Sequence, residues 1–167
     1  TQDGTPNGIY GLNGDGWEWA IGLRTNNGEI QILTGNNAAK NTADLTAGSA
    51  EWKAILPDGT LVAPGTAGTL KIDIVSGVPK ICTTVKTTTS GDQWPSTPFK
   101  DLAVESGITI PDILKALAVF PSDNSDHGGD RFYARNDGEK CFFRGGYWSS
   151  TSNAGVFYLR GGNPRSY

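Results

Sequence analysis

The C-terminal end of this 167-residue chain alternates tyrosines with short polar side chains. Tyrosine provides a large contact area at low entropic cost, whereas serine and asparagine form hydrogen bonds in many directions, so this combination is typical of a surface that binds a ligand. The candidate ligand-binding residues are Tyr147, Ser149, Ser150, Asn153, Tyr158, Arg160, Asn163 and Tyr167. The residues that we expect to hold the backbone between them are Trp148, Ala154, Gly155, Val156, Phe157, Leu159 and Pro164. The alternative interpretation is a polar strand-and-turn region that binds no ligand.

The composition of residues 147–167 fits two classes of ligand. Aromatic rings stack on the faces of sugars, and asparagine, serine and arginine form hydrogen bonds with sugar hydroxyls. The same side chains suit a protein epitope, because tyrosine and arginine are enriched in protein interfaces. A glycan and a protein are therefore both candidate ligands.

A second candidate site lies near the N-terminus, where Asn13, Asp15 and Glu18 place oxygen atoms at short spacing in a glycine-rich loop. Calcium binds hard oxygen ligands of this kind. We therefore consider a structural calcium site. The alternative is that Asn13 and Asp15 only form a turn, while Glu18 takes a buried hydrogen bond.

The sequence offers no recognisable catalytic motif, so we expect a protein that is not an enzyme and requires no cofactor. No serine or cysteine stands in a nucleophile motif, and we expect the single histidine, His127, to be a solvated loop side chain. Cys82 and Cys141 are either two buried thiols or one disulfide, and two cysteines cannot form a cysteine-only metal site.

Charge and composition exclude several classes of partner. With 14 basic and 17 acidic residues the net charge is −3, so we expect no nucleic-acid partner. No apolar stretch approaches the roughly 20 residues that a membrane-crossing helix needs, so we expect no membrane insertion. The 23 glycines, 9 prolines and 5 tryptophans favour a loop-rich globular domain.

The elements that must position these residues belong to an α+β class with irregular antiparallel strands, two short helices and long loops. Alternating apolar residues and turn signals predict hairpins over 17–33 and 70–85, a short element near 52–56, and strands over 131–135, 141–147 and 156–160. Capping residues and apolar spacing predict helices over 96–105 and 109–121. We expect one domain over 1–167, with 34–95 as an elaboration.

Three motifs resemble one family. Residues 8–19 (GIYGLNGDGWEW) resemble the "GLYDxxGNVWEW" signature of the formylglycine-generating-enzyme/sulfatase-modifying family, a branch of the C-type lectin fold. Residues 144–148 (RGGYW) match the family's "RGGxW" strand, and residues 163–166 (NPRS) its "RS" element. Residues 144–166 are more closely similar to the C-terminal segments of diversity-generating-retroelement target proteins, which include phage tail-fibre tips and surface adhesins.

This resemblance implies a C-type-lectin-like, non-catalytic domain that binds a receptor. Its partner would be a host surface glycan or protein, and its location the virion surface or the extracellular space. It implies that the candidate ligand-binding residues are positions allowed to vary, and that a structural calcium lies near the first motif. A homo-oligomer is expected, and for a fibre tip a trimer. The alternative function is a structural virion protein that uses the fold for subunit assembly.

The chain also differs from the family pattern, and these differences lead to two further expectations. Family members have further strands before the first motif and after the last, so we expect the lectin-like domain to be incomplete at both ends. The catalytic branch resembles a copper-dependent thiol oxidase with cysteines after the "RGGxW" strand. No cysteine lies between Trp148 and Tyr167, so oxidase activity is the least favoured function.

Overall fold

A computed structural model describes residues 16–125 and 127–166 of the chain. Their strands are β1 (Glu18–Asn26), β2 (Glu29–Leu33), β3 (Trp52–Ile55), β4 (Leu61–Val62), β5 (Lys71–Val75), β6 (Val78–Cys82), β7 (Ser96–Pro98), β8 (Ala103–Val104), β9 (Arg131–Ala134), β10 (Glu139–Arg144) and β11 (Leu159–Asn163). The helical segments are α1 (Asp112–Ala116) and the 3₁₀ turns η1 (Thr34–Ala39), η2 (Phe99–Asp101), η3 (His127–Gly129) and η4 (Thr151–Asn153).

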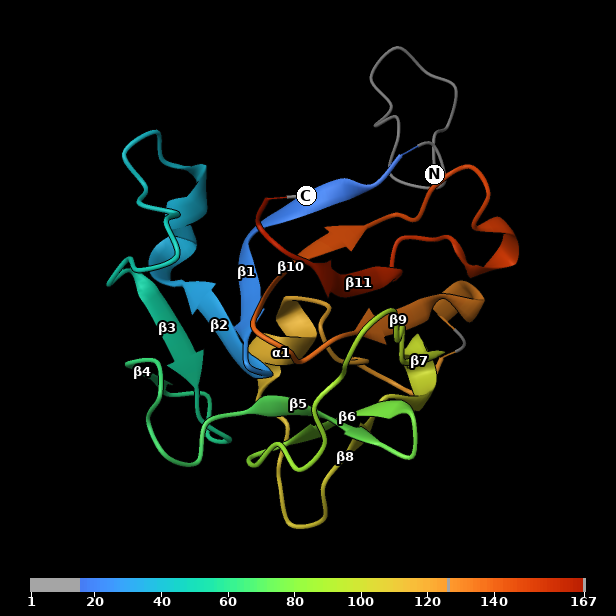
Figure 1. Ribbon diagram of the computed structural model, residues 1–167, viewed down its shortest axis with the longest axis horizontal. Coiled ribbons are helices and arrows are strands. Elements are labelled where there is room, and N and C mark those ends of the chain that lie inside the picture. The colour runs from blue at the N-terminus through green and yellow to red at the C-terminus, as the bar shows by residue number, and fades with distance from the viewer. Residues whose placement is uncertain (1–15, 126, 167) are drawn as a thin grey trace.

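The strands form one mixed sheet in the order β7-β9-β11-β10-β1-β2-β5-β6-β8, with β3 and β4 branching from β2. Most neighbouring strands are antiparallel, but two pairs, β9 with β11 and β6 with β8, are parallel. Figure 1 shows β3 and β4 at one side of the molecule and β7 and β9 at the other. A sheet-based domain with few helices and long loops agrees with the expected α+β class, whereas the C-type lectin fold stays a prediction.

Both predicted hairpins are confirmed. Strands β1 and β2 pair with Asn26 opposite Glu29, so the chain turns at Asn27 and Gly28, as is typical of two-residue hairpin loops. Strands β5 and β6 pair with Val75 opposite Val78, on either side of Ser76 and Gly77. The element expected near 52–56 is strand β3, which pairs with β2 and thereby joins residues of the expected elaboration to the main sheet.

The helix predicted over 96–105 is wrong. Ser96–Pro98 forms β7 on the edge of β9, a 3₁₀ turn follows, and Ala103–Val104 pairs with β6. Proline at position 98 removes an N–H and disfavours the helical region for Thr97, so strand pairing prevails over the capping signal. The helix predicted over 109–121 exists only as α1 and ends where Ala118 adopts a positive φ of 46°.

The C-terminal strands are present with shifted limits. Strand β9 lies within the predicted 131–135. Strand β10 begins before the predicted 141–147 and ends at Arg144, because Gly145 and Gly146 have positive φ values of 84° and 73° that turn the chain out of the sheet. Strand β11 begins only at Leu159, later than the predicted 156, so residues 145–158 form a long connection between two neighbouring strands.

The core is one cluster of apolar side chains from the sheet and from the segment 99–119. Its fully buried side chains include Ile30, Ile55, Leu70, Ile72, Ile81, Phe99, Leu114, Val119, Phe132, Phe142 and Leu159. No helix within the described residues is long and apolar enough to span a bilayer. The 145–158 connection leaves the sheet after β10 and returns to it at β11.

Candidate functional site

A pocket of about 330 Å³ is lined by the 145–158 connection, β11, β9 and the loop before β7. Its lining residues are Trp94, Tyr133, Tyr147, Ser149, Ser150, Thr151, Asn153, Tyr158 and Arg160. Most of the ligand-binding residues that the sequence predicts are among them, namely Tyr147, Ser149, Ser150, Asn153, Tyr158 and Arg160. The volume lies at the lower end of the range of about 300–1,000 Å³ that is usual for small-ligand sites.

Local hydrogen bonds shape the first half of the connection. The backbone N–H of Tyr147 donates to Oγ of Ser150 at 3.1 Å, and the N–H of Ser150 donates to the carbonyl of Tyr147 at 2.8 Å. The N–H of Asn153 in turn donates to the carbonyl of Ser150 at 3.1 Å. These bonds form a tight turn that presents Ser149 and Thr151 at the surface. The hydroxyl-bearing residues of the pocket are therefore positioned by short-range contacts.

Asp130 anchors the second half of the connection. Its carboxylate Oδ2 accepts a hydrogen bond from the N–H of Phe157 at 2.8 Å, and its backbone carbonyl accepts one from Phe99 at 2.7 Å. Asp130 is buried, and this burial raises the pKa of its carboxyl group. The connection is thus attached to the core just before Tyr158 enters the pocket.

Arg160 contacts two indole rings. Its guanidinium carbon is 4.0 Å from the ring centroid of Trp94 and 4.4 Å from that of Trp17. Both distances are within the range of cation–π interactions. Contact with both indoles restricts the movement of the guanidinium.

Two tyrosines complete the aromatic part of the pocket. Arg160 is in register with Tyr133 on the parallel strand β9, and the rings of Tyr133 and Tyr158 are 5.5 Å apart. Burial raises the pKa of Tyr158 to about 12, so its hydroxyl is neutral at physiological pH. The pocket therefore combines neutral hydroxyl groups with one cation.

Trp94 and Tyr133 were not predicted as site residues, although the sequence contains a signal for each. Trp94 packs against Gly162, where an added Cβ atom would lie 2.2 Å from Cζ3 of the indole. The sequence signal is the pair Gly161-Gly162, which leaves room for another side chain to approach the backbone of β11 closely. Tyr133 alternates with the buried Phe132 and Ala134 along a predicted strand, which places it on the opposite face. Thr151 extends the predicted polar run directly.

The structure places one predicted ligand-binding residue, Asn163, outside the pocket lining. Asn163 is buried at the end of β11, where it pairs with Cys141 of β10, and it does not line the pocket. Tyr167 lies outside the described residues.

Trp148, Val156 and Pro164, which we expected to hold the backbone, are not packed in the core. The side chain of Trp148 is 83% exposed, and Val156 and Pro164 are exposed as well. Gly145 and Gly146 turn the chain before Trp148, which places it on the surface instead of in the strand face that the "RGGxW" pattern implied. Leu159 and Gly155 are buried, in agreement with the expectation.

The calcium prediction is not resolved by the described residues. Asn13 and Asp15 lie outside them, and Glu18 is an exposed side chain at the start of β1. Within residues 16–125 and 127–166 there is no group of three or more His, Cys, Asp or Glu side chains that could hold a metal ion. The calcium site stays a prediction.

His127 is not a solvated side chain, which corrects the expectation. Its side chain is only 2% exposed, its Nδ1 lies 2.8 Å from the carbonyl of Ser125, and its ring packs edge-on against Phe99 and Phe157. The loop therefore turns inward and uses His127 as part of the support beneath the pocket connection. Cys82 is buried and Cys141 is half-buried, and both are free thiols whose pKa is raised by burial.

No known protein-family model matches the chain, and no curated protein is similar to it in sequence. The resemblance to the sulfatase-modifying family and to retroelement target proteins therefore stays a prediction.

Proposed function

We propose that the chain is a non-catalytic, lectin-like recognition domain that binds a glycan or protein on a host surface. The resemblance favours display on a phage tail fibre or a cell surface, with weak single sites made effective by repetition in an oligomer. One observation supports the proposal most. Residues chosen from the sequence as a ligand-binding set, among them Tyr147, Asn153 and Arg160, line one pocket.

The chemistry of the lining supports reversible binding. Hydroxyl and amide groups from Ser149, Ser150, Thr151 and Asn153 can donate and accept hydrogen bonds. The rings of Tyr133 and Tyr158 give rigid contact area beside them. Such a mixture of adaptable polar groups and rigid aromatics is the composition of natural binding surfaces.

The test is a blocking substitution with a matched control. Ser149 is exposed in the pocket, so Ser149→Phe fills the site without disturbing the core, and Ser106→Phe makes the same change at an exposed turn outside the pocket lining. Fluorescently labelled protein is incubated with a panel of bacterial cells, and bound protein is measured by flow cytometry. We expect the wild type and Ser106→Phe to bind at least one strain, and Ser149→Phe to lose that binding. Equal binding by both variants contradicts the site.

A second candidate function, subunit assembly in a virion, is favoured by exposed apolar side chains on β1. Trp19 is 43% exposed and Ile21 is 65% exposed, on a stretch where the pairing of β1 with β10 is irregular. Contiguous exposed apolar surface often marks an interaction site. Under this alternative, sedimentation velocity shows that the wild type is an oligomer. Ile21→Ser and Ser149→Phe both dissociate this oligomer, and the protein binds no cell type.

A further inference from the structure

We infer that the pocket binds a sugar that carries a carboxylate, and that the guanidinium of Arg160 holds this carboxylate. The inference rests on the proposed function and narrows its ligand class. Arg160 is the charged residue among the described lining residues, and the indoles of Trp94 and Trp17 lie against its guanidinium.

Among the residues that the structure describes, no carboxylate neutralises the charge of Arg160. Of the described residues that line the pocket, Arg160 alone is charged. No carboxylate within residues 16–125 and 127–166 forms an ion pair with it, whereas the nearby Arg135 pairs with Asp137 at 3.0 Å. Its Nε is buried and has no hydrogen-bond partner in the described part of the chain. An anion is the ligand group that this arrangement lacks.

The guanidinium is held ready for a carboxylate. Arginine presents N–H donors in a planar fork that matches the two oxygens of a carboxylate. The ring centroids of Trp94 and Trp17 lie 4.0 Å and 4.4 Å from the guanidinium carbon, so both rings restrict the guanidinium before any ligand arrives. Preorganisation lowers the entropy lost on binding, so a single cation can contribute substantially to affinity.

The remaining lining favours a sugar over an acidic peptide. Sugar hydroxyls both donate and accept hydrogen bonds, and the serine, threonine and tyrosine hydroxyls of this pocket do the same. A volume of about 330 Å³ accommodates one terminal residue of a glycan rather than a length of folded chain. Beside the pocket, the exposed ring of Trp148 lies edge-on to Tyr147 at 6.5 Å and offers a stacking surface for the next sugar.

The experiment is an NMR titration of ¹⁵N-labelled protein with acidic sugars and their neutral counterparts. The probes are sialyllactose against lactose, trigalacturonate against its methyl ester, and tetraglutamate as an acidic peptide. The variants are Arg160→Gln, Arg160→Lys and, as a matched control, Arg131→Gln on the neighbouring strand β9, which is outside the lining. The methyl-ester comparison uses the wild type alone, so it remains decisive if Arg160→Gln fails to fold.

We expect at least one acidic sugar to shift the indole N–H resonance of Trp94, and its neutral counterpart to bind at least about tenfold more weakly. Arg160→Gln should lose affinity by a similar factor, Arg160→Lys by less, and Arg131→Gln should bind like the wild type. Equal binding of acidic and neutral sugars overturns the inference, as does undiminished binding by a folded Arg160→Gln. Binding of tetraglutamate without either acidic sugar overturns the sugar class.

The two proposals fail in different ways. If the wild type binds cells in a Ser149-dependent manner but binds no acidic sugar, the carboxylate inference is wrong and the recognition function stands. If it binds neither cells nor any of the probes, both are wrong.

Discussion

At the scale of single residues, the pocket depends on the absence of a side chain at Gly162. Gly162 has no Cβ, and the indole of Trp94 occupies that space and stacks on Arg160. The sequence signal for this contact is a glycine, Gly162, two positions after Arg160, because residues two apart in a strand lie on the same face. The tryptophan that fills the space is far away in the chain, so its contact could not be predicted from local spacing.

Gly162→Ala should displace Trp94 with little loss of stability. The new Cβ would lie 2.2 Å from Cζ3 of an indole that is 38% exposed and can swing outward, so we expect a destabilisation of about 1 kcal/mol or less. Tryptophan fluorescence should shift toward that of a solvated indole, and ligand binding should weaken. Gly48→Ala is the control, because nothing lies within 4 Å of its added Cβ. Unchanged fluorescence in Gly162→Ala would show that Trp94 is not seated there.

At the scale of elements, local pairing was predictable and long-range pairing was not. The hairpin turns at Asn27-Gly28 and Ser76-Gly77 follow from adjacent residues, and both hairpins are present. Strand β7 exists because Ser96, Thr97 and Pro98 find β9 as a partner more than thirty residues later in the chain. Their sequence alone carries a capping signal that favours a helix. For the same reason the polar half of the pocket, formed by one segment, was predicted, whereas Trp94 and Tyr133 were missed.

The turn between β9 and β10 is an element with a clear pH dependence. Burial disfavours the charge of Asp137, but hydrogen bonds from Arg135, Thr89 and Lys140 outweigh it and lower the pKa of Asp137 to about 2. The carboxylate thus has a lower pKa in the folded than in the unfolded chain, where an aspartate has a pKa of about 3.9. Its contribution to stability is fully present above about pH 4 and is lost as the pH falls toward about 2.

Asp137→Asn should therefore remove part of the acid sensitivity of folding. Urea unfolding at several pH values between neutrality and about pH 2 measures it. We expect the variant to be less stable than the wild type at neutral pH and the difference to shrink on acidification. A constant difference across this range would contradict the assignment of Asp137 as the titrating group.

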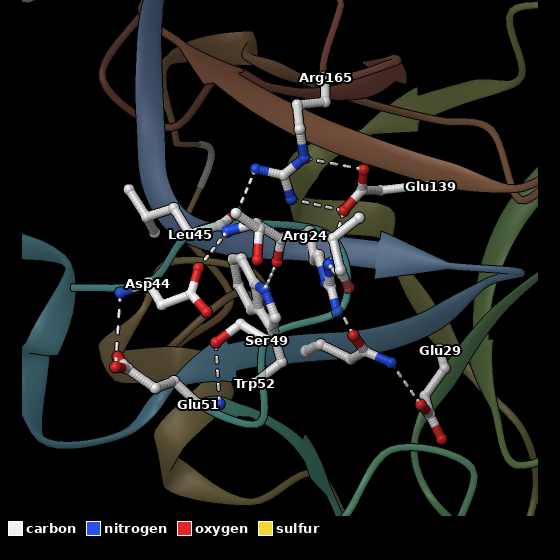
Figure 2. A network of polar contacts seen from close by, with 12 residues as sticks. Arg24, Glu29, Asp44, Leu45, Ser49, Glu51, Trp52, Glu139 and Arg165 are labelled. Carbon is white, nitrogen blue, oxygen red and sulfur yellow. Dashed lines mark hydrogen bonds and ion pairs between the residues drawn. The ribbon is translucent and has the colours of Figure 1, made fainter.

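At the scale of the whole molecule, one polar network joins segments that are far apart in sequence. Figure 2 shows Glu139 of β10 between two arginines, Arg24 of β1 and Arg165 near the C-terminal end. The carboxylate Oε1 of Glu139 lies 2.6 Å from a guanidinium nitrogen of each. Arg165 also donates to the carbonyl of Leu45, and Arg24 stacks on Trp52 at 4.0 Å. The network thereby ties the loop before β3 and the end of the chain to the centre of the sheet.

The buried part of this network explains how β2 can contain two buried polar side chains, Glu29 and Gln31. Nε of Arg24 donates to Gln31 at 2.8 Å, and Nε2 of Gln31 donates to the buried carboxylate of Glu29 at 2.6 Å. The hydroxyl of Thr69 donates to the same carboxylate at 2.6 Å. Every member is paired with a charge or a donor, which is the condition for burying such groups without a large penalty.

Glu139→Gln tests whether this network holds the molecule together. The side chain of Arg24 is only 4% exposed, so removing the charge of Glu139 leaves a buried guanidinium without its counter-ion and should cost roughly 2–4 kcal/mol in the free energy of unfolding. Glu105→Gln is the matched control, because its partner Lys86 is 66% exposed and such surface pairs contribute little to stability. Urea denaturation measures both variants. The pocket is supported by Asp130 and by the indoles of Trp94 and Trp17, not by Glu139. A folded Glu139→Gln protein should therefore keep its cell binding. A loss of binding together with stability would mean that the C-terminal end and the pocket are one cooperative unit.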